Sequence, residues 1–154
     1  MAPSLRFPAL VALVGLAACH SGARPAAVAA PAAPEAAVQA FLTAVDSNSI
    51  DQMAALWGDA NGPPTDRRIL REREQRLTII QRLLRHDAFQ FVAAPADAPA
   101  ARQGRRLVWV ELASGATRTT VPFTTVAQRH GGWLIENIGL EALMPSATPR
   151  PRTP

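Results

Sequence analysis

Along the central part of the chain, hydrophobic positions follow a helical period up to about Asp87 and a strand-like pattern after it. In the first segment, which begins near Pro34, apolar residues fall at i, i+3, i+4 and i+7, the spacing of one helix face. These residues are Val38, Phe41, Leu42 and Val45. Pro34 at an early helical position and Glu35 in the first turn both favour the start of a helix here.

A second, shorter helix is predicted from Ile50 to Trp57. Ser49 and Gln52 have the spacing of a capping box at its start. Gly58 is placed to end this helix in a left-handed conformation, which glycine adopts readily. The segment that follows, Asn-Gly-Pro-Pro at residues 61–64, has the composition of a loop.

A third and longer helix is predicted to run to about Arg85, with Thr65 or Asp66 as its cap. One side of this helix is apolar and carries Ile69, Leu77, Ile80 and Leu84. On another side, charges of alternating sign stand four residues apart, at Arg68, Glu72 and Arg76. Side chains at this spacing are neighbours on a helix, so these charges are expected to pair across turns.

Four β-rich runs follow Asp87. They cover Phe89 to Ala93, Leu107 to Leu112, Thr117 to Gln128 and Trp133 to Leu140. Turn residues at 114–115 and 130–132 separate the last three runs and are short enough for hairpins. Pro122 has no N–H to donate to a ladder, so its strand is expected to lie at an edge or to be bulged there. The pattern predicts an α+β domain, with three N-terminal helices packed on an antiparallel sheet of about four strands.

In two of the runs, residues 107–112 and 133–138, apolar side chains occupy both alternating positions. Alternating positions of a strand point to opposite faces of a sheet, so both faces are expected to be partly buried. Three helices can cover only one face. The hypothesis for the other face is a second copy of the chain, which would make the protein a homodimer.

The first residues have the layout of a secretory signal. One cation, Arg6, precedes an apolar run of about 12 residues from Phe7 to Ala18, which is shorter than the roughly 20 residues of a membrane-spanning helix. The run ends in Leu-Ala-Ala-Cys at residues 16–19, which resembles the lipobox of bacterial lipoproteins. Cys19 is the only cysteine, so an internal disulfide is excluded. We therefore expect residues 1–18 to be a signal peptide and Cys19 to carry the lipid that binds the bilayer.

The segments that flank the domain are poor in core-forming residues. Residues 19–34 are expected to form a lipidated Ala/Pro-rich tether, residues 35–144 the folded domain, and residues 145–154 a disordered Pro/Arg tail. His20 follows the expected lipidated cysteine. Lipoprotein sorting rules that use Asp there for inner-membrane retention imply the outer membrane, with the domain facing the periplasm of the cell envelope.

Charge argues against a nucleic-acid partner. The formal net charge is +4, but residues 35–144 contain 12 Arg against 12 Asp plus Glu, so the predicted domain is neutral. A neutral domain lacks the basic patch that phosphate binding requires.

The order of elements resembles the nuclear transport factor two-like fold, also called a cystatin-like cone. The residues that carry the resemblance are the predicted helices at 37–45 and 50–57 and the closing strand at 131–138. One departure is that no strand is predicted between the second and third helices. The resemblance implies helices packed on a curved sheet around a cavity, which members of the family use for catalysis, binding or dimerisation.

Candidate chemistry in that cavity is sparse. Enzymes of this fold use Asp, His or Tyr as acids and bases, and the chain has no Tyr. The remaining candidates are Asp46, His86 and Asp87 at predicted helix ends. No acid–base pair has a spacing that would place it on one buried face, so no catalytic residue is assigned. The three histidines lack metal-ligand spacing, so neither a metal site nor a cofactor is expected.

The candidate pocket residues are three tryptophans and one arginine: Trp57, Trp109, Trp133 and Arg73. Arg73 interrupts the apolar side of the third helix, where it would bind an anionic ligand if it pointed inward. The commoner outcome is that such tryptophans pack in the core and that such an arginine is solvated.

The leading hypothesis is a membrane-tethered, non-catalytic domain that binds an envelope protein or a small apolar ligand, or that only spaces other envelope components. The alternative is a small cavity enzyme, an isomerase, dehydratase or hydrolase.

Overall fold

The computed structural model describes residues 30–144. The expected signal peptide at residues 1–18, the lipidation site Cys19, most of the tether and the tail at residues 145–154 lie outside the described residues. Within residues 30–144, none of the helices combines the length and the apolar character that crossing a membrane requires.

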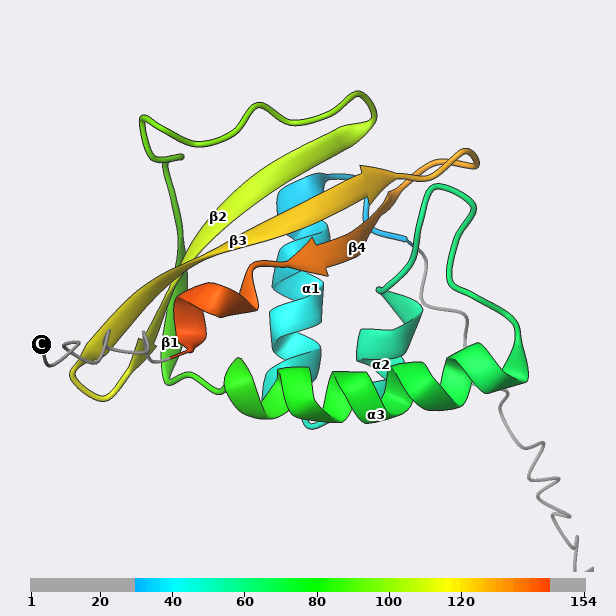
Figure 1. The fold of residues 1–154 in the computed structure, drawn as a ribbon, viewed down its shortest axis with the longest axis horizontal. Helices are drawn as coiled ribbons and strands as arrows, with labels where there is room; N and C mark the ends of the chain where they lie inside the picture. Colours follow the sequence, from blue (N-terminus) through cyan, green and yellow to red (C-terminus); the bar gives the residue numbers. More distant parts are fainter. Residues whose placement is uncertain (1–29, 145–154) are drawn as a thin grey trace, which may run out of the picture.

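The described residues form an α+β fold with three helices and one four-stranded antiparallel sheet, whose strand order is β1-β2-β3-β4 (Figure 1). The elements are α1 (Pro34–Asp46), α2 (Ile50–Ala55), α3 (Arg67–Leu83), β1 (Ala88–Val92), β2 (Arg105–Ser114), β3 (Thr117–Ala127), β4 (Trp133–Ile138) and the short 3-10 helix η1 (Leu140–Leu143). The predicted α+β class, with helices before strands, is confirmed.

The helix starts follow from local chemistry. Helix α1 begins at Pro34, as predicted. The hydroxyl of Ser49 accepts a hydrogen bond from the backbone N–H of Gln52, which satisfies one free donor at the start of α2. Of the two candidate caps for α3, Asp66 takes the role, because its carboxylate accepts from the backbone N–H groups of Arg68 and Ile69.

The end of α2 differs from the prediction. The helix stops at Ala55, and Gly58 is absent from the residues with a left-handed backbone. The chain instead leaves the helix to pair with β4: Gly58 donates to the carbonyl of Ile135 at 3.0 Å, and Ile135 donates to the carbonyl of Leu56 at 2.8 Å. Pairing with β4 is therefore the physical reason that α2 ends early, and it supplies a short strand-like segment that the sequence did not predict.

The charged side of α3 also differs from the prediction. The predicted ion pairs of Glu72 with Arg68 and Arg76 do not form within 4.0 Å in the described part of the chain. These side chains are exposed, where water competes for a pair and its free energy is small.

Pro122 does not lie in an edge strand, because β3 runs between β2 and β4. At this position, however, β4 has already ended. The carbonyl of Pro122 accepts from Gly139, one residue beyond the end of β4, and the proline ring is therefore placed where a ladder donor is not needed. The expected irregularity is present two residues further on, as a register shift between Thr124 and Thr125.

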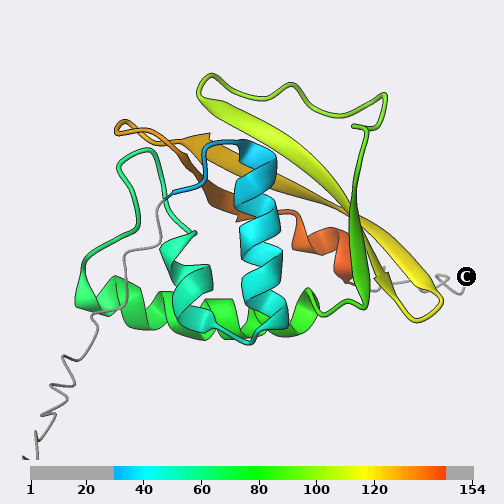
Figure 2. The same cartoon turned by 180° about the vertical axis from the view of Figure 1, so that it is seen from behind.

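The core lies between the helices and one face of the sheet. Helix α1 crosses the sheet, as seen from behind in Figure 2, and buries Phe41 against Phe123 of β3. On β2, every second residue points into this core, namely Val108, Val110 and Leu112. Helix α3 packs on α2 and contributes Leu77 and Leu84 to this core.

Gly58 supports a first prediction. A Cβ at this position would lie 2.6 Å from the carbonyl oxygen of Gly62 and 2.7 Å from Cδ1 of Leu134. We expect Gly58→Ala to lower the free energy of unfolding by about 1 to 3 kcal/mol, the usual cost of overpacking. Urea unfolding of the full chain measures this change.

The control for that experiment is Gly115→Asn. Gly115 is in the β2–β3 turn with φ +56°, a conformation that Asn tolerates, and it has open space around it. We expect this variant to lose less stability than Gly58→Ala; an equal loss would show that the close approach at Gly58 is not the cause.

Candidate functional site

A cleft of about 580 Å³ lies between the loop of residues 57–65 and the N-terminal half of α3. In Figure 1 this loop rises from the end of α2 and returns to the start of α3. The cleft is bounded on a third side by Glu136 of β4. Its volume is within the range of small-molecule sites, about 300 to 1,000 Å³.

Hydrogen bonds within the loop of residues 57–65 and from the loop to the sheet fix its conformation. Asp59 and Gly62 form an antiparallel bridge, and the carboxylate of Asp59 accepts from the backbone N–H of Asn61 at 2.7 Å. Gly62 has φ +112°, a conformation that favours glycine. The N–H of Arg129, in the β3–β4 turn, donates to the carbonyl of Ala60 at 3.0 Å. The loop is therefore attached to the sheet as well as to the helices.

The apolar part of the lining comes from the loop and from α3: Trp57, Pro63, Pro64, Ile69 and Leu77. The Trp57 ring packs against Phe41 of the core at a centroid distance of 5.8 Å. Ile69 is 44% exposed, which is unusual for a large aliphatic residue on the side of α3 that faces a cleft. An apolar ligand would bury this side chain and gain hydrophobic free energy.

Arg73 lies in the middle of α3 and lines the cleft. Its Nη1 donates to the carbonyl of Trp57 at 3.1 Å, and its buried Nε has no hydrogen-bond partner among the described residues. Burial lowers the pKa of the Arg73 guanidinium below its usual value, and the charge of Glu74 offsets part of this shift. The group remains charged at neutral pH, because arginine is not deprotonated in proteins.

On the side of the cleft formed by β4, Glu136 takes part in a partly exposed ion pair. Glu136 accepts hydrogen bonds from Arg105 of β2, from Nη2 at 2.6 Å and also from Nε. This hydrogen bonding and the negative charge of Glu136 raise the pKa of Arg105. The Glu136 carboxylate is therefore already neutralised by a protein cation, whereas Arg73 has no carboxylate within 4.0 Å in the described part of the chain.

Of the four candidate pocket residues, the structure brings Trp57 and Arg73 together in this cleft and places the other two elsewhere. Trp109 alternates on β2 with the core residues Val108 and Val110, so it lies on the sheet face opposite to the core. There it is opposite Val92 of β1 and Pro122 of β3. Its Nε1 is buried without a partner among the described residues. Trp133, at the start of β4, packs against the edge of the core. The three tryptophans therefore do not line one pocket.

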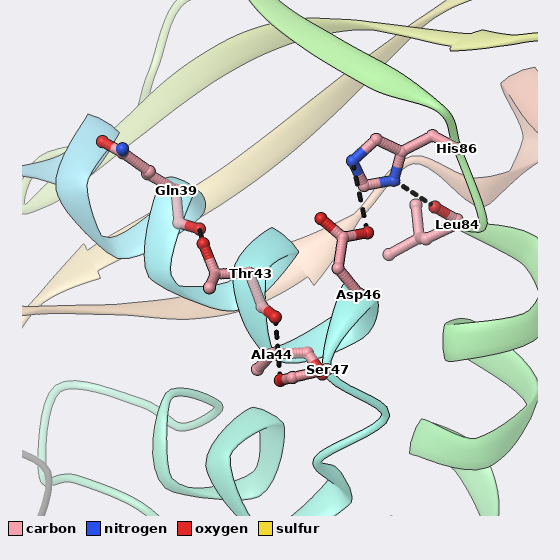
Figure 3. A network of polar contacts seen from close by, with 7 residues as sticks. All are labelled: Gln39, Thr43, Ala44, Asp46, Ser47, Leu84 and His86. Carbon is pink, nitrogen blue, oxygen red and sulfur yellow. Dashed lines mark hydrogen bonds and ion pairs between the residues drawn. The ribbon is translucent and has the colours of Figure 1, made fainter.

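Apart from the cleft, a polar contact between Asp46 and His86 joins the end of α1 to the segment that connects α3 and β1 (Figure 3). Nε2 of His86 lies 3.6 Å from Oδ1 of Asp46, and Nδ1 lies 2.9 Å from the carbonyl oxygen of Leu84. The His86 side chain is only 2% exposed, while that of Asp46 is 52% exposed. Tertiary packing thus brings together two acid–base candidates that are far apart in the sequence, but Asp46 is half exposed, so they do not share a buried face.

This arrangement leaves His86 poorly suited to acid–base catalysis. A carbonyl oxygen only accepts, so Nδ1 carries the hydrogen of its bond to Leu84, and Nε2 faces Asp46. His86, Asp46 and Asp87 line a second cavity of about 600 Å³, but the imidazole is almost fully buried and Nδ1 is engaged by the backbone. The third candidate, Asp87, accepts from the N–H of Gly115 at 2.7 Å and fixes the β2–β3 turn. Within residues 30–144, no group of three or more His, Cys, Asp and Glu side chains could hold a metal ion.

Sequence reasoning missed several residues of the cleft. Ile69 was assigned to the apolar side of α3, and neither Glu136 nor Arg105 was singled out. The proline pair at residues 63–64 was the one local signal of a long loop beside the candidate Trp57. The position of Glu136 opposite Arg73 has no local signal, because it depends on how β4 packs beside the loop.

Comparison with known proteins gives no relative: no family model, no curated protein and no solved structure matches the chain.

The buried histidine supports a second prediction. His86→Leu replaces the imidazole with an apolar side chain of similar size and removes the donor to Leu84, leaving a partly buried carbonyl without its partner. We expect a loss of about 1 to 3 kcal/mol in the free energy of unfolding. Asp46→Asn is the comparison variant, and because Asp46 is half exposed we expect it to lose less than about 1 kcal/mol. Equal losses in urea unfolding would mean that the Asp46 contact, and not the backbone bond, holds His86.

Proposed function

We propose that the chain is a lipid-anchored, non-catalytic binding domain of the bacterial cell envelope, and that the cleft beneath the loop of residues 57–65 holds its ligand. The observation that carries the binding proposal is the cleft itself. It combines exposed apolar side chains, of which Ile69 is the largest aliphatic example, with the charged Arg73. Sites of this kind bury the apolar body of a ligand and orient it through a few polar groups.

The cone-like architecture is part of the same proposal. Helix α1 covers one face of the sheet, and the segment at Trp57 pairs with β4 where a further strand of such a cone would run. These features support a relationship to the nuclear transport factor two-like fold. In that architecture the space between helices and sheet serves many functions, so the fold by itself selects neither binding nor catalysis.

Binding is favoured over the alternative of a small cavity enzyme. The cleft-lining acids are Asp59, Glu72 and Glu136, and no histidine lines it. Asp59 is engaged in its own turn and Glu136 in an ion pair. A general acid or base needs a proton-carrying group within reach of the substrate, and the described lining offers only Glu72 in that role.

The homodimer remains a prediction. Leu107, Trp109 and Pro122 lie on the sheet face opposite to the core and are only partly buried in the single chain. A second copy that covers these side chains would remove them from water. Light scattering of the chain without its lipid is the measurement that decides between monomer and dimer.

The anchor supports a third prediction. The full chain is expressed in a bacterium that processes lipoproteins and is labelled with an alkyne analogue of palmitate. We expect the wild-type chain to carry the label and to sediment with membranes, and Cys19→Ala to lose both properties, because the acylated thiol is the attachment point. Ser21→Ala is the matched control and should keep the label. An unlabelled wild-type chain would contradict the lipoprotein assignment.

The cleft supports a fourth prediction. The neutral amphipathic probe 4-phenylbutanol is titrated into the full isotope-labelled chain and followed by two-dimensional NMR. We expect chemical-shift changes at Trp57, Gly62 and Ile69. Ile69→Glu should weaken binding at least about tenfold, since it places a charge where the apolar body lies.

Ile79→Glu is the matched control for this experiment. Ile79 is on the same helix and is 59% exposed, but it does not line the cleft. This variant should bind the probe as the wild type does. Shift changes that map to the sheet face around Trp109, and not to the cleft, would refute the binding proposal.

A further inference from the structure

Arg73 is a cleft residue that has few hydrogen-bond partners among the described residues. A guanidinium has five N–H donors, and in the described part of the chain only one protein acceptor, the carbonyl of Trp57, is bonded to it. Its Nε is buried and has no partner among the described residues, so a ligand would reach the guanidinium through its Nη groups. Burying a charge without a counter-charge is unfavourable for folding, so such a residue contributes little to stability in the free protein.

The remaining charges of the cleft are satisfied or exposed. Glu136 is paired with Arg105, and the carboxylate of Asp59 is bonded within its own turn. Glu72 and Arg76 are exposed and of opposite sign, so water and salt screen them. Arg73 is the half-buried charge of the cleft that has no carboxylate within 4.0 Å among the described residues, since the neighbouring Glu74 acts on it only from a longer distance. Its attraction for an anion is less screened than that of the exposed charges.

The apolar lining lies next to this cation. Trp57, whose carbonyl accepts from Arg73, also lines the cleft, and Ile69 lies one helical turn before Arg73 on the same helix. A molecule that reached the guanidinium with a negative group would therefore place its apolar part against Trp57 and Ile69. A planar guanidinium forms two parallel hydrogen bonds with a carboxylate, which a neutral hydroxyl cannot do.

We propose that Arg73 is the anion-binding residue of the cleft and that the ligand is a small amphipathic carboxylate, with its apolar body against Trp57 and Ile69. This inference rests on the proposed function, since it names the class of ligand for the same cleft. The alternative role for Arg73 is structural: its bond to Trp57 would only hold the loop of residues 57–65 in place.

The test compares two probes of the same shape, 4-phenylbutanoate and 4-phenylbutanol, titrated into the full chain and followed by NMR. We expect the carboxylate to bind at least about tenfold more tightly, because hydrogen bonds to a charged group are the stronger kind. Arg73→Gln should remove this preference, so that the carboxylate binds no more tightly than the alcohol does. Arg71→Gln, an exposed arginine on the same helix, is the control and should change neither affinity.

Each other outcome has a distinct meaning. Equal affinity for the two probes, with no effect of Arg73→Gln, would overturn the anion-binding role and leave the cleft as a binding site for neutral ligands. A loss of affinity for both probes in Arg73→Gln would overturn it in favour of the structural role. No binding of either probe in the cleft would overturn the inference together with the proposed function.

Arg73→Lys provides a second variant if the glutamine variant fails to fold. Lysine keeps the charge but lacks the planar fork. We expect it to fold and to prefer the carboxylate less strongly than the wild type does; an unchanged preference would contradict two-point recognition by the guanidinium.

Discussion

The pair of backbone hydrogen bonds between Ile135 and the segment of Leu56 to Gly58 joins the helical layer to the sheet. At this point Gly58 also lies so close to Gly62 that a Cβ would stand 2.6 Å from its carbonyl oxygen. The two backbone hydrogen bonds fix the end of α2, the start of the loop above the cleft and the carbonyl of Trp57 to which Arg73 donates. The geometry of the candidate site therefore depends on Gly58, which itself lines the cleft.

The hydrophobic core acts together with this constraint. Phe41 of α1 contacts both Trp57 and Phe123, so one buried ring links the loop, the first helix and the middle of the sheet. Since packed interiors resist changes in volume, the Trp57 ring cannot move far without disturbing α1. A cleft built on such a support is largely pre-formed, and a ligand would bind it with little loss of conformational entropy in the protein.

Features set by nearby residues could be predicted from the sequence. The start of α1 at Pro34, the caps Ser49 and Asp66, and the β2–β3 turn all depend on interactions within a few residues. For the same reason, the α+β class and the order of elements could be predicted from hydrophobic spacing alone.

Features set by tertiary contacts could not be predicted. A glycine after a helix usually indicates a left-handed end, but Gly58 is required for a close approach to β4, and the sequence does not distinguish these two uses. The contact of His86 with Asp46 depends on the packing of two elements separated by two helices. The interruption of an apolar face by Arg73 is visible in the sequence, whereas its partner carbonyl and the neighbouring Glu136 depend on the fold.

The described chain begins beside the β3–β4 turn: Trp133 donates to the carbonyl of Pro31, and Gly132 leaves no room for a Cβ next to Ala30. The same turn holds the loop above the cleft through Arg129 and Ala60. The first described residues and the rim of the cleft therefore lie at the same end of the molecule. The segment at Pro31 and the loop above the cleft are thus attached to the same turn, so a displacement of this turn would change both.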